Sequence, residues 1–306
     1  MKIHLILLSF LFVFSGLNAQ TVTITNVEQD GQILVVSYDI TGGTGKFEVS
    51  LFCSTDDGTT WAGPLKSVSG DVGKNIAAGL TKKITWTVLN DRADLKGDQI
   101  RFKVKASKGE GTVTDVDGNK YETVRIGDQV WMKENLKVKR YNNGDLILTS
   151  LNSNQWASTT EGAFTLYNNS VVNNTSYGKL YNWYAVTDSR RLCPIGWHVP
   201  SDADWVKLVD HLGGDLLAGG MLKSTSTLWQ VPNENASDES GFSGLPGGNR
   251  YFDGNYLNLG GNGYWWSSTE FSYNAAWCRS LGYFYSNFYR DNYFKRNGFS
   301  VRCIKD

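Results

Sequence analysis

Apolar and polar residues alternate in short runs through the first third of the chain, between residues 20 and 107. The runs are TVTITNVEQ, QILVVSYDI, KFEVSLFCS, KKITWTVL and QIRFKVKAS. Strict alternation places every second side chain on one face of an extended strand, and the segments between the runs are rich in Gly and Asp, as turns are. Because no helical period occurs here, the pattern predicts a small antiparallel β-sandwich over residues 20–107.

The pattern changes after residues 108–111, KGEG, which we expect to form a short polar linker. Alternation then resumes on both sides of Asp117-Gly118, a pair of residues that suits a hairpin turn. Two later segments predict helices. YGKLYNWYAV (177–186) is compact and aromatic, and SDADWVKLVDHLGG (201–214) has its apolar residues at helical spacing.

The second of these helices has the clearer start and stop signals. Ser201 is placed as an N-cap, Asp204 completes a capping box, and Gly213 ends the helix. After Gly214 the pattern indicates no further helix, only short strands near GYWWSST, AAWCRSLGY and GFSVRCIKD between long loops. The predicted fold class is therefore an N-terminal all-β sandwich followed, over residues 112–306, by an α+β domain with long loops.

The first nineteen residues have the composition of an export signal. Lys2 gives a basic start, residues 5–14 are almost wholly apolar, and Ala19 ends a stretch of small residues. The apolar run is about half of the ~20 residues that a membrane-spanning helix requires. We therefore expect a signal peptide at residues 1–19, cleaved after Ala19, no transmembrane segment, and a location outside the cell, at its surface or in a periplasm.

Composition narrows the choice of partners. The chain has 30 basic and 30 acidic residues, so the basic surplus of a nucleic-acid-binding protein is missing and we predict no nucleic-acid partner. Aromatic residues make up 13% of the chain, and nine of the eleven Trp lie after residue 108. This aromatic surplus needs a structural explanation.

Motifs that carry chemistry are scarce. His198 and His211 are the only histidines after the signal peptide, and neither has a Cys or Glu at zinc-ligand spacing. The segment DVDGN lacks the spacing of a calcium loop, and no G-x-S-x-G elbow is present. GFSGLPGG lacks the lysine of a phosphate-binding loop. We therefore predict no catalytic residue, no metal site and no cofactor.

The cysteines are Cys53, Cys193, Cys278 and Cys303. In an exported protein they can form disulfides, and four cysteines allow three full pairings. The sequence alone does not choose among these pairings. A bond from Cys53 would have to join the two predicted domains.

Six motifs occur in one order along the second domain: IGDQVWMKENL (126–136), YGKLYNWYAV (177–186), CPIGWHVPSDADW (193–205), GFSGLPGGNR (241–250), WWSST (265–269) and GFSVRC (298–303). Together they resemble the Fibrobacter succinogenes major paralogous domain, called FISUMP, over about residues 112–306. The resemblance implies a C-type-lectin-like fold in which the N- and C-terminal strands pair and the long second half displays loops. The first domain resembles immunoglobulin-like or fibronectin type III modules, and we interpret it as a spacer.

The resemblance also bears on the cysteines and on calcium. In C-type-lectin-like domains a long disulfide ties an early helical region to the last strand, which implies a Cys193–Cys303 bond and leaves Cys53 and Cys278 free. The alternatives are a Cys278–Cys303 bond and a Cys193 that is simply buried. The triplets that bind calcium in C-type lectins have no equivalent at VPNEN or WWSST, so we expect no calcium-dependent sugar site.

The strongest functional signal is the residue mixture near the C-terminus. Between Tyr251 and Phe299, 17 of 49 residues are aromatic and 7 are Asn. Antibody paratopes favour this mixture, and exposed aromatic clusters mark interaction sites. The alternative is that these rings fill a core that is poor in aliphatic residues. The predicted contact residues are Tyr283, Tyr285, Asn287, Tyr289, Asn292 and Tyr293.

We therefore expect an exported, non-catalytic display protein that binds an unidentified protein or glycan ligand through this surface. The oligomeric state is not indicated. The FISUMP family looks related to formylglycine-generating enzymes, so the alternative is an oxidase in which Cys278 and Cys303 form a reactive pair. A third alternative is a purely structural component of the cell surface.

Overall fold

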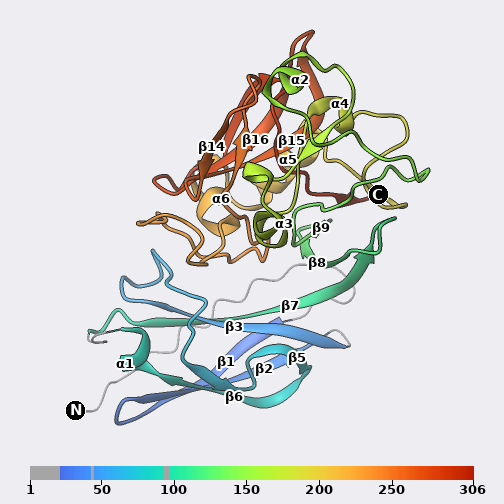
Figure 1. Ribbon diagram of the computed structural model, residues 1–306. Coiled ribbons are helices and arrows are strands. Elements are labelled where there is room, and N and C mark those ends of the chain that lie inside the picture. Colours follow the sequence, from blue (N-terminus) through green and yellow to red (C-terminus); the bar gives the residue numbers. More distant parts are fainter. Residues whose placement is uncertain (1–20, 43–44, 93–94, 96) are drawn as a thin grey trace. The chain divides into compact units, whose positions relative to one another are not determined.

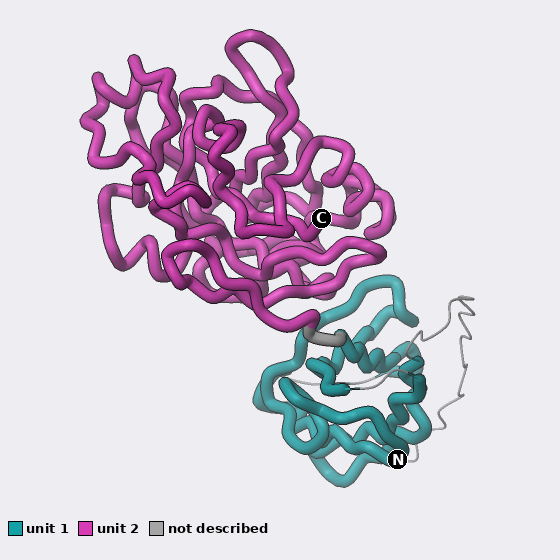
Figure 2. Tube along the Cα trace, turned by 90° about the vertical axis from the view of Figure 1, so that its right-hand side faces the viewer, with its two compact units in different colours: residues 1–109 teal, residues 110–306 magenta. Residues whose placement is uncertain are grey.

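The computed structural model describes residues 21–42, 45–92, 95 and 97–306. The chain divides into two compact units, Met1–Gly109 and Glu110–Asp306 (Figure 2). The predicted signal peptide, residues 1–19, lies outside the described residues. The described part is rich in β-structure, with short helices in the second unit (Figure 1).

The first unit is built almost wholly from strands. Its elements are β1 (Thr21–Asp30), β2 (Ile33–Thr41), β3 (Lys46–Ser54), β4 (Val68–Gly70), β5 (Gly73–Ala77), β6 (Gly79–Thr87), the short helix α1 (Val88–Asp91) and most of β7 (Arg101–Thr114). One sheet has the order β1-β2-β6-β4, and in the other β3 pairs with β5 and β7. The alternating runs of the sequence become β1, β2, β3, β6 and β7 because both sheets bury one face in a shared core. Residues 108–111, predicted as a linker, belong to strand β7.

The second unit contains most of the helices. Its further elements are β8 (Lys120–Ile126), β9 (Gln129–Met132), α2 (Ser153–Ser158), β10 (Phe164–Thr165), η1 (Tyr167–Asn169), α3 (Val171–Tyr177), β11 (Leu180–Tyr181), α4 (Trp183–Val186), β12 (Trp197–His198), α5 (Asp202–His211), α6 (Asp215–Leu222), β13 (Gly247–Arg250), β14 (Tyr256–Leu259), β15 (Asn262–Ser272), β16 (Ala275–Gly282), β17 (Tyr289–Phe294) and β18 (Ile304–Lys305). The last strand, β18, pairs with the early strand β9 and with β12, so the early and final strands of this unit meet as expected.

A five-stranded sheet organises the C-terminal part of this unit. Its order is β14-β13-β15-β16-β17, which leaves β17 at one edge. Strand β15 sends Tyr264 and Trp266 into one hydrophobic core and Trp265 into the other. Alternation along one strand thus buries consecutive aromatic residues on both faces. Much of the aromatic surplus is therefore core.

Helix α5 has the predicted start. The side chain of Ser201 accepts a hydrogen bond from the backbone N–H of Asp204, and the carboxylate of Asp204 accepts one from the N–H of Ser201. Trp205, Leu208 and Val209 of this helix are buried, as their spacing predicts.

Other helix predictions were wrong. Residues 177–186 are not one helix, because Gly178 (φ 78°) ends α3 and the chain forms β11 before Asn182 caps α4. Helix α6 was not predicted, since its two central glycines weaken the helical signal. A side chain at Gly219 would collide with the backbone carbonyl of Ser286, so close packing explains this glycine. Strands β13 to β17 likewise occupy much of a region expected to be mostly loops.

Candidate functional site

The connection between β16 and β17, together with the first residue of β17, carries a row of aromatic side chains, Tyr283, Phe284, Tyr285 and Tyr289, which we call the aromatic row. Consecutive ring centroids along the row lie 5.5, 6.2 and 5.7 Å apart, and the ring planes are nearly perpendicular. Edge-to-face contacts at these distances are favourable for aromatic pairs. The exposed fraction is 60% for Phe284, 52% for Tyr285 and 39% for Tyr289.

Two other contacts of this connection explain why the row stays at the surface. Phe288 is fully buried and contacts Trp205, with 5.6 Å between ring centroids. Tyr283 is half-buried and packs against the same core. Because Phe288 and Tyr283 point inward on either side of them, Phe284 and Tyr285 are directed toward solvent.

The backbone of the connection is held by neighbouring segments. The N–H of Phe288 donates to the carbonyl of Asp215 (2.9 Å), and the carbonyl of Ser286 accepts from the N–H of Gly220 (3.1 Å), so α6 supports one side. The N–H of Glu234 donates to the carbonyl of Tyr283 (2.8 Å) from a second loop. These hydrogen bonds give the aromatic row a defined conformation.

The structure brings together three of the six predicted contact residues, Tyr283, Tyr285 and Tyr289, and adds Phe284. Phe284 was not among the predicted contact residues. It lies between Tyr283 and Tyr285 in the same aromatic run, so the sequence pattern that selected those two residues applies to it equally. Asn287 lies half-buried in the connection, next to α6.

The remaining two predicted residues lie elsewhere. Asn292 is opposite Trp277 in the β16–β17 pairing, on the other face of the strand from Tyr289. Tyr293 is half-buried, with its ring packed on Tyr264 and Phe299 at centroid distances of 5.9 and 5.3 Å, so the structure does not place it in the aromatic row. Burial raises the pKa of the Tyr293 phenol, as expected for a ring held in the core.

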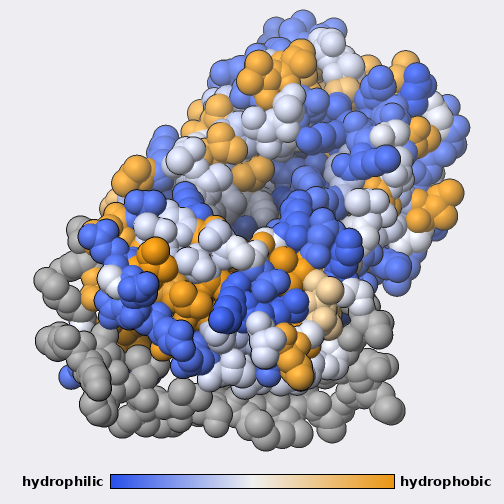
Figure 3. Space-filling view, turned by 90° about the horizontal axis from the view of Figure 1, so that it is seen from below, coloured by the Kyte–Doolittle hydropathy of each residue, from blue (hydrophilic) through white to orange (hydrophobic). Residues whose placement is uncertain are grey.

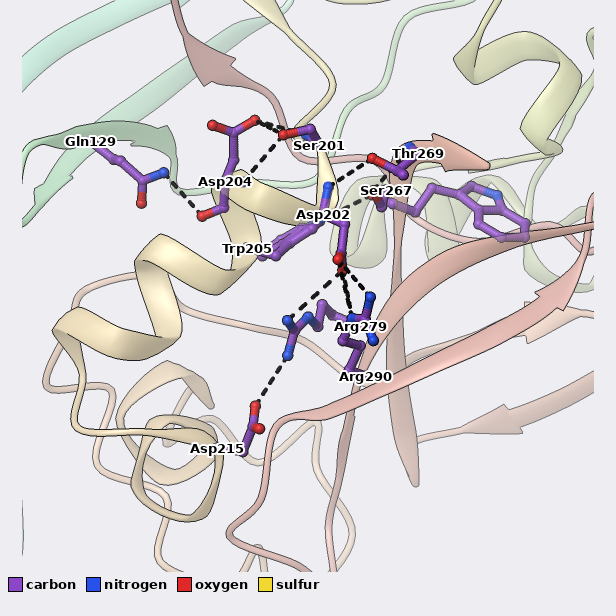
Figure 4. Close-up of polar contacts among 11 residues, drawn as sticks. Gln129, Ser201, Asp202, Asp204, Trp205, Asp215, Ser267, Thr269, Arg279 and Arg290 are labelled. Carbon is purple, nitrogen blue, oxygen red and sulfur yellow. Dashed lines mark hydrogen bonds and ion pairs between the residues drawn. The ribbon is translucent and has the colours of Figure 1, made fainter. Parts of the chain in front are cut away.

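An ion-pair network joins Arg279 and Arg290 to Asp202 and Asp215 (Figure 4). Arg290 forms a bidentate contact with the carboxylate of Asp202, at 2.8 to 3.1 Å, and its guanidinium lies 3.5 Å from the ring centroid of Trp277. Arg279, only 2% exposed, pairs with Asp215 at 3.1 Å and lies 3.9 Å from Asp202. Both carboxylates are in the first turn of a helix, where negative charge is favourable. The network therefore fixes the starts of α5 and α6 against β16 and β17.

Exposure of single apolar residues does not by itself mark this site. Figure 3 shows apolar side chains scattered among polar ones over the face that it draws. Such scattered residues are normal on protein surfaces. The aromatic row differs from such single residues in that its rings contact one another in series.

The structure contains the Cys193–Cys303 disulfide that the resemblance implied. Cys53 and Cys278 are free and buried, so the alternative Cys278–Cys303 bond is not formed. Burial raises the pKa of the Cys278 thiol, which disfavours its reactive thiolate. The pair of reactive thiols considered for an oxidase is therefore not present as Cys278 and Cys303.

Neither histidine lies in a ligand cluster. His198 bonds to the carboxylates of Asp306 (2.6 Å) and Asp204 (3.4 Å), which links β12 to α5. Across the described ranges, no group of three or more His, Cys, Asp or Glu side chains could hold a metal ion. In the same part of the chain, no helix has the length and apolarity needed to cross a membrane.

The sequence motifs meet inside the second unit around Asn135 and Arg302. The side-chain oxygen of Asn135 accepts from Arg302 (2.7 Å) and from the indole of Trp265 (2.8 Å). The guanidinium of Arg302 also lies 4.1 Å from the ring centroid of Phe242. Burial lowers the pKa of Arg302 to about 9. Segments 126–136, 241–250, 265–269 and 298–303 thus supply one buried polar cluster.

Comparison with known proteins agrees with these motifs. The sequence model of the Fibrobacter succinogenes major domain family matches residues 124–305. This chain belongs to that family. No curated protein and no solved structure matches the chain.

The position of the aromatic row within this Fibrobacter succinogenes major domain is informative. The row lies inside the matched span but outside the six motifs, whose residues are mostly buried. In this domain the motif aromatics therefore build most of the core, and the aromatic row is a part of the surplus that is exposed.

Proposed function

We propose that this chain is an exported, non-catalytic binding protein whose aromatic row contacts a protein or glycan ligand. The observation that carries the proposal is a continuous series of four rings, three of them exposed, on a connection that is held from two sides. Clustered exposed aromatic residues are typical of binding hot spots.

The magnitude of the possible contact is substantial. A Tyr or Phe side chain buries about 150–250 Å² when fully covered, and the rings of Phe284 and Tyr285 are about half exposed. Covering the remaining ~100 Å² of each ring would contribute about 2–3 kcal/mol per ring at ~25 cal/mol per Å². A row that is already ordered loses little conformational entropy on binding, which favours affinity.

The proposal includes the finer features of the fold and location. The second unit is proposed to be C-type-lectin-like, and the first an immunoglobulin-like or fibronectin type III-like spacer. Residues 1–19 are proposed to be a signal peptide cleaved after Ala19. The Cys193–Cys303 disulfide supports export, because such bonds persist in oxidising compartments.

Two alternatives remain distinct from binding. An oxidase of the formylglycine-generating kind would use a pair of reactive thiols, and the burial of Cys278 together with the bonded state of Cys303 supports a non-catalytic role. A purely structural surface component would need no specific ligand. The experiment below separates this last alternative from binding.

The test is retention of the purified, oxidised protein on glycan and protein arrays. A variant with Phe284→Ser, Tyr285→Ser and Tyr289→Ser should lose retention and keep a melting temperature close to that of the wild type. The matched control is Tyr273→Ser, which removes an 88% exposed ring at the β15–β16 turn, outside the row. Equal retention of the triple variant and the wild type, or no retention of the wild type at all, would contradict the proposal.

A further inference from the structure

A buried lysine lies directly beneath the aromatic row. Lys223 follows the last residue of α6, and it is 0% exposed. Its ammonium donates to the backbone carbonyls of Glu234 (2.6 Å), Gly282 (3.1 Å) and Tyr285 (2.6 Å). An ammonium has three N–H donors, so all of them are used here.

The carbonyls that Lys223 binds lie on both sides of the first rings of the aromatic row. Gly282 and Tyr285 flank Tyr283 and Phe284, so one ammonium holds this stretch of the row at both ends. The third carbonyl ties in the loop of Glu234, whose N–H already bonds to the carbonyl of Tyr283. An apolar side chain in place of the lysine would leave buried carbonyls without this partner, which is costly.

We infer that Lys223 is the positioning residue of the aromatic row: by donating to the carbonyls of Gly282 and Tyr285, its terminal amino group, charged or neutral, keeps Tyr283, Phe284 and Tyr285 in their binding conformation. This inference rests on the proposed function for its biological meaning. The geometric claim, that Lys223 orders the connection, concerns the unliganded protein and can be tested without a ligand.

The charge of Lys223 gives this arrangement a specific pH dependence. Burial lowers the pKa of Lys223 from its ordinary 10.5 to about 8, and the Glu234 carboxylate acts in the opposite direction. Asp238, in the same loop, is instead acted on by Lys133 and Arg302, and Asp215 of α6 is paired with Arg279. Among the described residues, Glu234 is therefore the charged group that faces the ammonium.

The direction of the effect follows from linkage. When the connection opens, Lys223 returns to water and its pKa returns to the ordinary value, so the open state binds a proton between pH 8 and 10.5. Protons therefore favour opening, and opening becomes rarer as the pH rises through this range. From pH 8 to pH 9 the open fraction should fall about fivefold.

Native-state cleavage by chymotrypsin measures this opening, because the connection is rich in Tyr and Phe and cleavage tracks the open population. The full-length oxidised protein is compared with Lys223→Met, which keeps a long unbranched side chain without the charge. The matched control is Lys207→Met on α5, whose side chain is 58% exposed. Mass spectrometry assigns cleavage to residues 283–289, and a free peptide of residues 280–292 corrects for the pH dependence of the protease.

We expect Lys223→Met to be cleaved within residues 283–289 at least tenfold faster than the wild type at pH 8, and Lys207→Met to match the wild type. The wild type should show the fivefold decrease from pH 8 to pH 9, and Lys223→Met should show none. Equal cleavage of Lys223→Met and wild type would overturn the inference, and a wild-type rate that is constant or rises with pH would overturn the pH dependence derived from it. If Lys223→Met does not fold, Lys223→Gln, which keeps N–H donors but has a shorter reach and no charge, takes its place in the same comparison.

These outcomes are independent of the array experiment. Faster cleavage of Lys223→Met, combined with no retention of the wild type on the arrays, would support the positioning role of Lys223 and contradict the binding proposal. Retention that depends on the aromatic row, combined with unchanged cleavage of Lys223→Met, would support the binding proposal and contradict the positioning role of Lys223.

Discussion

Removing the Cys193–Cys303 disulfide should destabilise the protein strongly. The bond joins residues 110 positions apart, from the segment before β12 to the residue before β18. Closing a loop of this length reduces the entropy of the unfolded chain by an amount worth about 4–5 kcal/mol at 25 °C. Both cysteines are also in the hydrophobic core, at 2% and 0% exposure, so truncation to Ala adds a small loss of packing.

The perturbation is the double variant Cys193→Ala with Cys303→Ala. The matched control is Cys278→Ala, which makes the same truncation at a buried free cysteine that is 1% exposed. Urea unfolding followed by Trp fluorescence gives the free energy of unfolding for each protein. The double variant should lose about 4 kcal/mol more than the control.

A loss in the double variant no larger than twice that of Cys278→Ala would refute this reasoning. That result would mean that the bond does not constrain the unfolded chain, and that the two cysteines contribute only through packing. Reduction of the wild type with dithiothreitol in the same assay should shift its unfolding midpoint toward that of the double variant.

Three further predictions concern the site and its supports. Tyr293→Ser should lower the free energy of unfolding by about 2 kcal/mol because its half-buried ring packs on two core rings, whereas Tyr285→Ser should change it by less than about 1 kcal/mol in the same urea assay. Burial raises the pKa of Asp238 from 3.8 to about 6, so ionisation of this carboxyl disfavours the folded state. The free energy of unfolding of Asp238→Asn should therefore increase relative to that of the wild type as the pH rises from 4 to 7. A difference in unfolding free energy that shrinks with rising pH would contradict this. Asp202→Asn removes the bidentate contact to Arg290 and should cost about 1 kcal/mol in thermal melts at low salt; a loss that is as large in 1 M NaCl would argue against an electrostatic role.

Local patterns in the sequence were sufficient for the elements that carry their own signals. Alternation identified the five long strands of the first unit, and the Ser201–Asp204 capping box identified the start of α5. The resemblance of the motifs identified the Cys193–Cys303 bond. The concentration of Tyr and Phe after residue 282 also located the aromatic row, because a short connection cannot bury so many rings.

Tertiary structure decided which side chains are covered. Alternation in β17 shows that Asn292 and Tyr293 lie on opposite faces, but only the positions of Tyr264 and Phe299 determine that the ring of Tyr293 packs against the core. The sequence likewise gives no reason to single out Lys223, since one of its carbonyl partners is 11 residues away and the other two are 59 and 62 residues away, at the end of β16 and just beyond it.

The physical reason is the same in both cases. Periodicity and capping act between residues that are close along the chain, so they can be inferred from spacing. Burial, hydrogen-bond partners and the pKa values that follow from them depend on which remote segments pack together, and neighbouring residues do not encode that packing.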